Sequence, residues 1–240
     1  MKKAIVFAPH PDDETLACGG TIAKKLSEGY DVSVVFITDG RYSLTDVGIS
    51  SRPTPFEMKE IRREESFRAA KVLGLKEENL LLLDFEDRTL GKHMKQFKER
   101  IVEILRDVSP EEVFFPQEKE YNIDHRITNL TIRKAIEILN IHPIQYQYTV
   151  AWCFPFYLLV HIISERMFDQ LMVKLLRANL IHLDISRFLP LKETAMKEYR
   201  SQITLFSTEQ TRPALKPSFV RRFTKNEEKF FVNSHTLEVS

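Results

Sequence analysis

The first 140 residues alternate between short apolar runs and segments with helical periodicity, and this alternation restricts the possible folds most strongly. The runs of strand length are Ala4–Ala8, Val32–Thr38, Leu80–Phe85 and Val113–Pro116. The segments with helical spacing are Thr15–Ser27, Phe56–Leu73, Phe97–Val108 and Ile127–Leu139. Such an order is typical of a parallel sheet covered by helices. Right-handed crossovers then predict an α/β fold with a Rossmann-like, three-layer α/β/α arrangement and a mainly parallel sheet.

Beyond residue 140 the pattern is less regular. The segments there predict a strand at Ile144–Ala151, a helix at Leu171–Leu180, a strand at Ile181–Ile185 and a helix at Leu191–Leu205. The tail, which contains Pro213 and Pro217, is expected to be irregular. No repeat, linker or low-complexity tract divides the chain. We therefore expect one domain over residues 1–240, with a less regular part over about 150–240.

Composition excludes several classes of protein. With 35 basic and 34 acidic residues the formal net charge is +1, which argues against a dedicated nucleic-acid-binding protein. Cys18 and Cys153 lie far apart and fit neither a disulfide scaffold nor a cysteine-based zinc site. Val150–Ile163 is apolar but shorter than the ~20 residues of a membrane span. We expect a cytoplasmic protein without stable membrane insertion.

Residues with metal-binding side chains follow the first predicted strand. His10 and Asp13 are three residues apart on a tight turn, so their side chains can reach one position, and Asp12 between them can act as a base. An imidazole nitrogen and a carboxylate oxygen both suit zinc, which needs a third ligand to leave one position for water. The alternative is that these acidic residues only stabilise the start of a helix.

A third candidate ligand, His125, comes after the predicted strand Val113–Pro116, which ends at the same edge of the sheet. Asp124 beside it could orient a ring or a loop. A single histidine at the end of a strand is more often hydrogen-bonded to a backbone carbonyl, and spacing alone leaves both explanations open. Two strand ends that both carry such residues favour a metal site.

The string Ala8-Pro9-His10-Pro11-Asp12-Asp13-Glu14 resembles the hallmark of the LmbE-like, or PIG-L, family of zinc-dependent de-N-acetylases. Further segments in the same order are similar to the family pattern. They are Thr38-Asp39-Gly40, Ile61–Glu65, Ala69–Gly74, Asp84–Asp87, Leu183–Ser186, Lys192, Ala195, Ser201-Gln202 and Glu228–Phe230.

The resemblance implies roles for individual residues. It makes His10, Asp13 and His125 the zinc ligands and Asp12 the general base. Arg62 would contact the substrate or support the site, against the alternative of a surface arginine paired with Glu65. The ligand set is also compatible with iron in the cell.

The chain departs from the family pattern at residue 122. Members usually have His-x-Asp-His, whereas this chain has Asn122-Ile123-Asp124-His125. The resemblance implies that the first of these residues helps the oxyanion or the leaving group, with Asp124 bracing it. Asn122 can donate a hydrogen bond to an oxyanion but cannot deliver a proton. The alternative is that Asp12 serves as both base and acid.

The resemblance therefore implies a metal-dependent hydrolase that removes an N-acetyl group from an N-acetylglucosamine-containing small-molecule conjugate. Two other functions stay open: a zinc hydrolase of another amide, and a catalytically weak metal-binding protein in which Asn122 reflects lost activity. The aromatic segment 152–159 is expected to be core or a subunit interface, which leaves a homo-oligomer open, rather than a pocket for an apolar aglycone.

Overall fold

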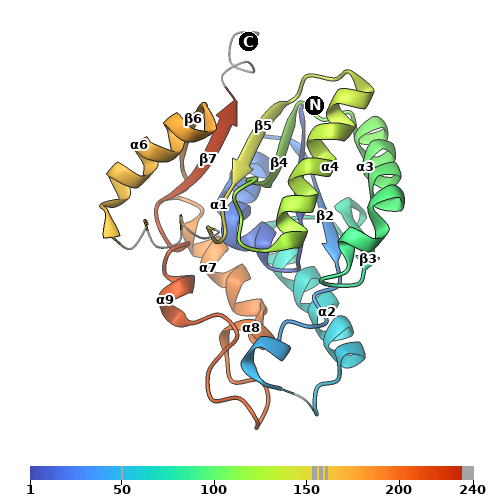
Figure 1. The fold of residues 1–240 in the computed structure, drawn as a ribbon, viewed down its shortest axis with the longest axis vertical. Helices are drawn as coiled ribbons and strands as arrows, with labels where there is room; N and C mark the ends of the chain where they lie inside the picture. Colours follow the sequence, from blue (N-terminus) through green and yellow to red (C-terminus); the bar gives the residue numbers. More distant parts are fainter. Residues whose placement is uncertain (50, 153–155, 157–158, 160–161, 234–240) are drawn as a thin grey trace.

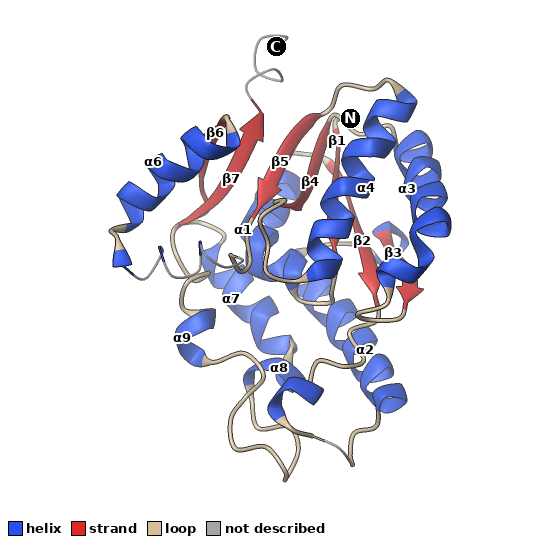
Figure 2. Cartoon of the chain, in the orientation of Figure 1, coloured by secondary structure: helices blue, strands red, loops and turns tan. Residues whose placement is uncertain are grey.

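A computed structural model describes residues 1–49, 51–152, 156, 159 and 162–233. Its strands form one sheet in the order β3-β2-β1-β4-β5-β7-β6 (Figures 1 and 2). The strands are β1 (Lys3–Ala8), β2 (Asp31–Thr38), β3 (Leu80–Phe85), β4 (Glu112–Pro116), β5 (Ile144–Tyr148), β6 (Ala178–Asp184) and β7 (Glu227–Asn233). β1 to β5 pair in parallel, and β7 is antiparallel to both β5 and β6. The predicted α/β fold with a mainly parallel sheet is confirmed.

Helices cover both faces of this sheet (Figure 1). The α-helices are α1 (Asp13–Ser27), α2 (Pro55–Leu73), α3 (Met94–Val108), α4 (Ile123–Leu139), α6 (Glu165–Leu176), α7 (Leu189–Glu198), α8 (Arg200–Ile203) and α9 (Pro217–Val220). Within the described ranges, short 3₁₀ turns lie at Thr45–Val47, Glu77–Asn79 and Leu90–His93. α1, α2 and α7 pack together on one face, and α3 packs beside α4 on the other. The result is the expected three-layer arrangement.

The sheet has a hydrophobic core on each face, because side chains alternate along its buried strands. In β1, Ala4, Val6 and Ala8 face the core of α1, α2 and α7, whereas Ile5 and Phe7 face the core of α3 and α4. Successive side chains of a strand point to opposite faces. A strand that is apolar at every position must therefore be covered on both sides, which places it in the middle of the sheet.

The second half of the chain differs from the sequence expectation. The helix predicted at Leu171–Leu180 is α6, which begins at Glu165 and ends at Leu176, so that β6 starts earlier than expected. Ser164 caps α6 by accepting a hydrogen bond from the Met167 amide. The single predicted helix over Leu191–Leu205 is two helices, α7 and α8, with Tyr199 between them in a non-helical conformation.

The expectation of an irregular tail is wrong at β7. This strand inserts between β5 and β6 and completes the sheet. Its residue Glu228 is buried and accepts hydrogen bonds from the Gly20 and Thr21 amides and from Lys192 Nζ at 2.6 Å. The tail is therefore tied to α1 and α7.

The aromatic segment is described only in part. Trp152 is buried and packs edge-to-face against Phe168, with ring centroids 5.2 Å apart, in a small core with Phe231. Trp152 therefore packs in a core, and it also borders the cavity that is described below. Cys153 and residues 154–155 and 157–158 lie outside the described residues.

None of the helices in the described part of the chain is long and apolar enough to cross a membrane.

Candidate metal centre and catalytic site

The loop between β1 and α1 presents the first group of site residues. Asp12, the residue before α1, has φ 123° and ψ −26°, a conformation that is strained for a residue with a side chain. Such strain costs about 1–3 kcal/mol and persists where neighbouring contacts enforce it. Here the Asp12 amide donates to Glu14 Oε2 at 3.0 Å. The Asp12 carboxylate makes no capping bond to α1, so it is available to the site.

The three predicted metal ligands meet at the edge of the sheet. His10 Nδ1 lies 3.2 Å from Asp13 Oδ2 and 3.1 Å from His125 Nε2. His125 Nε2 in turn lies 3.0 Å from Asp13 Oδ2. His125 belongs to the first turn of α4, which follows β4 and begins four residues earlier than predicted. Zinc held tetrahedrally at about 2.0–2.1 Å needs its ligand atoms only slightly farther apart. Two ring nitrogens and one carboxylate oxygen that converge on one point therefore fit zinc.

The other nitrogen of His10 faces two carboxylates. His10 Nε2 is 3.4 Å from Asp87 Oδ1 and 3.6 Å from Asp124 Oδ2. Asp124 Oδ2 also accepts a hydrogen bond from the Arg88 amide at 2.8 Å. Asp124 thus lies where it can orient the ring of His10. Asp87 is an additional site residue that the sequence reasoning did not assign to the site, although it ends one of the segments that resemble the family.

Burial and mutual contact shift the pKa values of these groups in the metal-free protein. Burial alone would raise the pKa of Asp13, but His125 and His10 lower it well below its usual range. Burial would lower the pKa of His125, but Asp13 and then Glu120 raise it to about 9. For Asp12, burial raises the pKa and Arg62 opposes it, with a result of about 7. A carboxyl group with that pKa can both accept and return a proton near neutral pH.

Arg62 lies inside the molecule, not on its surface. It belongs to α2 and is 1% exposed, with Nη2 3.1 Å from Asp12 Oδ2 and Nη1 3.9 Å from Glu65 Oε2. Its guanidinium also lies over the ring of Tyr199, 5.4 Å from the centroid. The alternative of a surface arginine is therefore wrong. Arg62 lies beside Asp12 in the interior, within ion-pair distance of Glu65 as well.

A buried network that sequence reasoning missed extends this support. Tyr199 Oη donates to Glu14 Oε1 at 2.5 Å, and Glu14 holds the Asp12 amide through its other oxygen. Tyr199 and Glu14 are both buried. Tyr199 lies three residues before Gln202, which belongs to one of the segments that resemble the family pattern. Its contact with Glu14 joins residues 185 positions apart, which no local pattern indicates.

Asn122 has a structural task that the sequence reasoning did not assign to it. Its side-chain oxygen accepts a hydrogen bond from the Asp124 amide at 2.8 Å and caps α4. Asparagine is among the preferred residues for that position. Only its side-chain amide nitrogen can therefore serve as the predicted oxyanion donor. Asp124 faces His10 instead of bracing residue 122.

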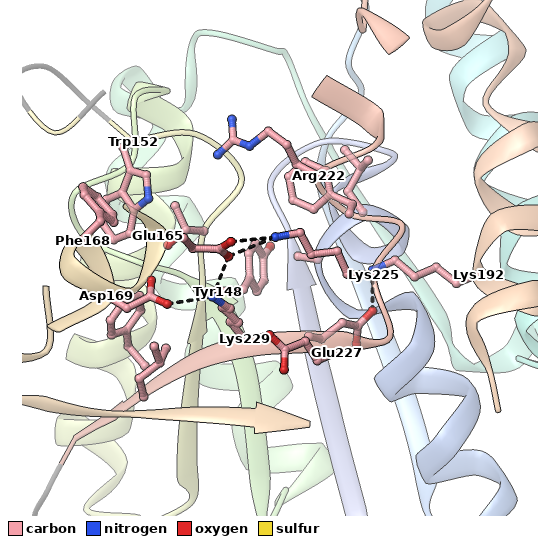
Figure 3. A pocket seen from close by; sticks show the side chains of 17 residues that line it. Tyr148, Trp152, Glu165, Phe168, Asp169, Lys192, Arg222, Lys225, Glu227 and Lys229 are labelled. Carbon is pink, nitrogen blue, oxygen red and sulfur yellow. Dashed lines mark hydrogen bonds and ion pairs between the residues drawn. The ribbon is translucent and has the colours of Figure 1, made fainter. Parts of the chain in front are cut away.

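A cavity of about 370 Å³ lies beside the end of β5, bounded by β6, β7 and α6 (Figure 3). Trp152, Phe168 and Phe231 line one side. Among its charged side chains, Lys225 and Lys229 both contact Glu165. His10, Asp13 and His125 are not among its lining residues, whereas Leu16 and Ala17, in the turn of α1 after Asp13, are.

The model of the PIG-L family, described as GlcNAc-PI de-N-acetylase, matches residues 5–136, which is more than half of the chain. The chain belongs to the PIG-L, or LmbE-like, family. The matched range includes His10, Asp12, Asp13, Arg62 and His125.

Two curated relatives carry different activities in their names. The diacetylchitobiose deacetylase of Thermococcus kodakarensis is 35% identical over 129 residues, which are 52% of this chain and 46% of that protein. The 4-oxalmesaconate hydratase of Pseudomonas putida is 32% identical over 127 residues, which are 52% of this chain and 48% of that protein. The matched regions thus span about half the length of these relatives.

The fold is similar to that of a solved deacetylase over nearly the whole chain. The N,N'-diacetylchitobiose deacetylase of Pyrococcus horikoshii, solved with an inhibitor, superposes with a TM-score of 0.67. The match covers 96% of this chain and 83% of that one at 22% identity. It shows that the fold, including the part after residue 140, is the LmbE-like fold.

Proposed function

We propose that this protein is a zinc-dependent N-deacetylase that acts on an N-acetylglucosamine-containing small molecule. The observation that carries the proposal is the convergence of His10 Nδ1, Asp13 Oδ2 and His125 Nε2 within 3.0–3.2 Å of one another, with the uncapped carboxylate of Asp12 in the same loop. Family membership and the deacetylase relative support the reaction and the amino-sugar substrate.

His10, Asp13 and His125 would hold the ion. When bound there, Zn²⁺ would act as a Lewis acid and make a water molecule a stronger nucleophile at neutral pH. The same donor set accommodates iron, and the choice of zinc rests on the family. Asp87 and Asp124 face Nε2 on the other side of the His10 ring, at 3.4 and 3.6 Å, where they would orient that ring.

Asp12 is the proposed general base. It would take a proton from the attacking water and return it to the nitrogen of the sugar amine as the amide bond breaks. Arg62 orients its carboxylate through the 3.1 Å contact and opposes its protonation. Asn122 can donate a hydrogen bond to the developing oxyanion through its amide nitrogen, but it supplies no proton. Asp12 therefore carries both proton transfers in this chain.

A second candidate function, hydration of an unsaturated carboxylic acid, has one observation in its favour. The hydratase relative is nearly as similar to this chain as the deacetylase relative, over a region of the same size. A site that activates water beside a carboxylate base suits either reaction. The substrate, not the metal centre, separates the two.

The test measures acetate release and hydration with the same zinc-loaded protein. The acetylated panel contains free N-acetylglucosamine, diacetylchitobiose, and inositol-linked and malate-linked N-acetylglucosamine; 4-oxalmesaconate is the hydratase substrate. We expect acetate from at least one sugar and loss of that activity in Asp12→Asn. Asp31→Asn, at the start of β2, is the matched control with unchanged activity. Turnover of 4-oxalmesaconate alone would replace the deacetylase proposal with the hydratase.

A further inference from the structure

Glu120 is a buried carboxylate on the segment between β4 and α4, five residues before His125. It is 0% exposed. Its oxygens accept hydrogen bonds from the Val150 amide and, at 2.9 Å, from the Ala151 amide. The Tyr121 amide donates in return to the Ala151 carbonyl at 2.7 Å. The segment after β5 therefore holds this carboxylate in a fixed position.

The ring of His125 lies between this carboxylate and the candidate metal centre. Its Nε2 faces Asp13 and His10, as described above. Its Nδ1 on the opposite side is buried and has no hydrogen-bond partner among the described residues. Glu120 Oε2 is 3.7 Å from that nitrogen, longer than a hydrogen bond but within ion-pair distance.

Metal binding at Nε2 determines whether Nδ1 carries a proton. A neutral imidazole that binds a metal through one nitrogen carries its proton on the other. A buried N–H group needs an acceptor, and a histidine that binds a metal usually donates to a carboxylate, a carbonyl or water. A carboxylate has about four lone-pair sites, so Glu120 can accept two amides and still accept this proton.

We propose that Glu120 is a positioning residue that accepts the Nδ1 proton of His125 and thereby fixes the ring for metal binding through Nε2. This inference rests on the proposed metal centre. Glu120 would then have a second function, in addition to accepting hydrogen bonds from the Val150 and Ala151 amides. If Glu120 only fixed the segment after β5, its replacement would not act through His125.

The first experiment compares zinc affinity by competition with a chelator. Glu120→Gln keeps the size of the side chain but removes the negative charge and leaves one acceptor oxygen in place of two. We expect its dissociation constant for zinc to rise about 10–100-fold, the usual effect of losing a partner of a metal-bound histidine. Glu118→Gln is the matched control, because Glu118 is half-exposed and contacts Arg133. Its affinity should stay unchanged.

The second experiment repeats Glu120→Gln in a His125→Ala background. If Glu120 acts through His125, the substitution should change zinc affinity there by less than about twofold, because the interacting partner is already gone. An equal loss in both backgrounds would mean that Glu120 only supports the fold, and would overturn the inference.

A measurement on the wild-type protein does not depend on a variant that folds. Imidazole ¹⁵N NMR of the zinc-loaded protein should show the His125 proton on Nδ1, and a proton on Nε2 would overturn the inference. The outcomes also separate this inference from the proposed function. Wild-type protein that binds zinc no better than His10→Ala contradicts both. Tight zinc binding that Glu120→Gln leaves unchanged contradicts only the role of Glu120.

Discussion

Arg62 Nη2 lies 3.1 Å from Asp12 Oδ2 in the interior of the protein, where a residue of α2 meets the strained loop before α1. The contact joins the proposed base to a guanidinium that is itself held over the ring of Tyr199. Burial favours the protonated form of Asp12, and Arg62 opposes it. This balance makes Arg62 a support for the base, and a contact of Arg62 with substrate is not required.

Replacing Arg62 should therefore impair the base more than substrate binding. In Arg62→Met, burial of Asp12 is no longer opposed, so the pKa of Asp12 rises above about 7 and less carboxylate is present at neutral pH. We expect kcat at pH 7 to fall, KM to change little, and part of the loss to recover as the pH is raised. The pH profiles of kcat and kcat/KM test this. Arg63→Met, which changes a half-exposed neighbour, is the control. A rise in KM with unchanged kcat would show that Arg62 binds substrate.

Tyr199→Phe removes only the hydroxyl that donates to Glu14. Glu14 is buried, so the loss of one partner should lower the free energy of unfolding by about 1–3 kcal/mol. Urea denaturation measures the change. Tyr121→Phe, at an exposed tyrosine, should alter stability by less than about 0.5 kcal/mol. Equal stability of the two variants would mean that Tyr199 does not hold Glu14.

Zinc binding should release protons and become tighter as the pH rises. In the metal-free protein the pKa of His125 is raised to about 9 and that of His10 is raised as well, so zinc must displace protons at neutral pH. The apparent affinity should increase up to about tenfold per pH unit for each proton displaced, until pH exceeds about 9. Calorimetry in buffers of different ionisation enthalpy counts these protons. An affinity that does not change between pH 6.5 and 8.5 contradicts the assignment.

The same shift predicts how pH affects the metal-free fold. Because the pKa of His125 is higher in the folded than in the unfolded chain, its stabilising contribution is complete below about pH 6.5. The contribution is lost as the pH rises through about 9. The free energy of unfolding of the metal-free protein should therefore fall over this range.

Asn122→His exchanges a helix cap for a group that can carry a proton. Loss of the cap should lower the free energy of unfolding by about 0.5–2 kcal/mol. The rate of deacetylation should rise, within the ~10²–10⁴-fold that a positioned acid typically contributes. Asn122→Ala is the control, because it loses the cap and gains no acid. If both variants lose activity equally, the role of Asn122 is limited to the start of α4.

The sequence was sufficient to predict the central sheet because its signals there are local. β1 is apolar at every position after Lys3, and β2 is apolar over Val34–Ile37, as strands buried on both faces must be. β7 gave no such signal, since three of its seven residues are charged: Glu227, Glu228 and Lys229. Its place in the sheet depends on antiparallel pairing with distant strands and on the bonds of Glu228 to α1 and Lys192.

Some residues of the site could likewise be predicted from local sequence signals, and others could not. His10, Asp13 and His125 could be proposed because the carboxyl ends of parallel strands meet at one edge of a sheet. Tyr199, Asp87 and Glu120 were not placed in the site, because their contacts depend on where distant segments pack. The predicted helix starts were wrong where a capping residue sets the start. Asn122 caps α4 and Ser164 caps α6, and both helices begin earlier than the spacing of apolar residues indicates.

The most direct test of the account is a zinc titration of the metal-free protein, followed by acetate release from diacetylchitobiose or from whichever N-acetylglucosamine conjugate the panel identifies as substrate. We expect no activity without metal, a linear rise to one equivalent of zinc per chain, and no such rise in His125→Ala. Full activity of the metal-free protein, or an unchanged titration in His125→Ala, would contradict it.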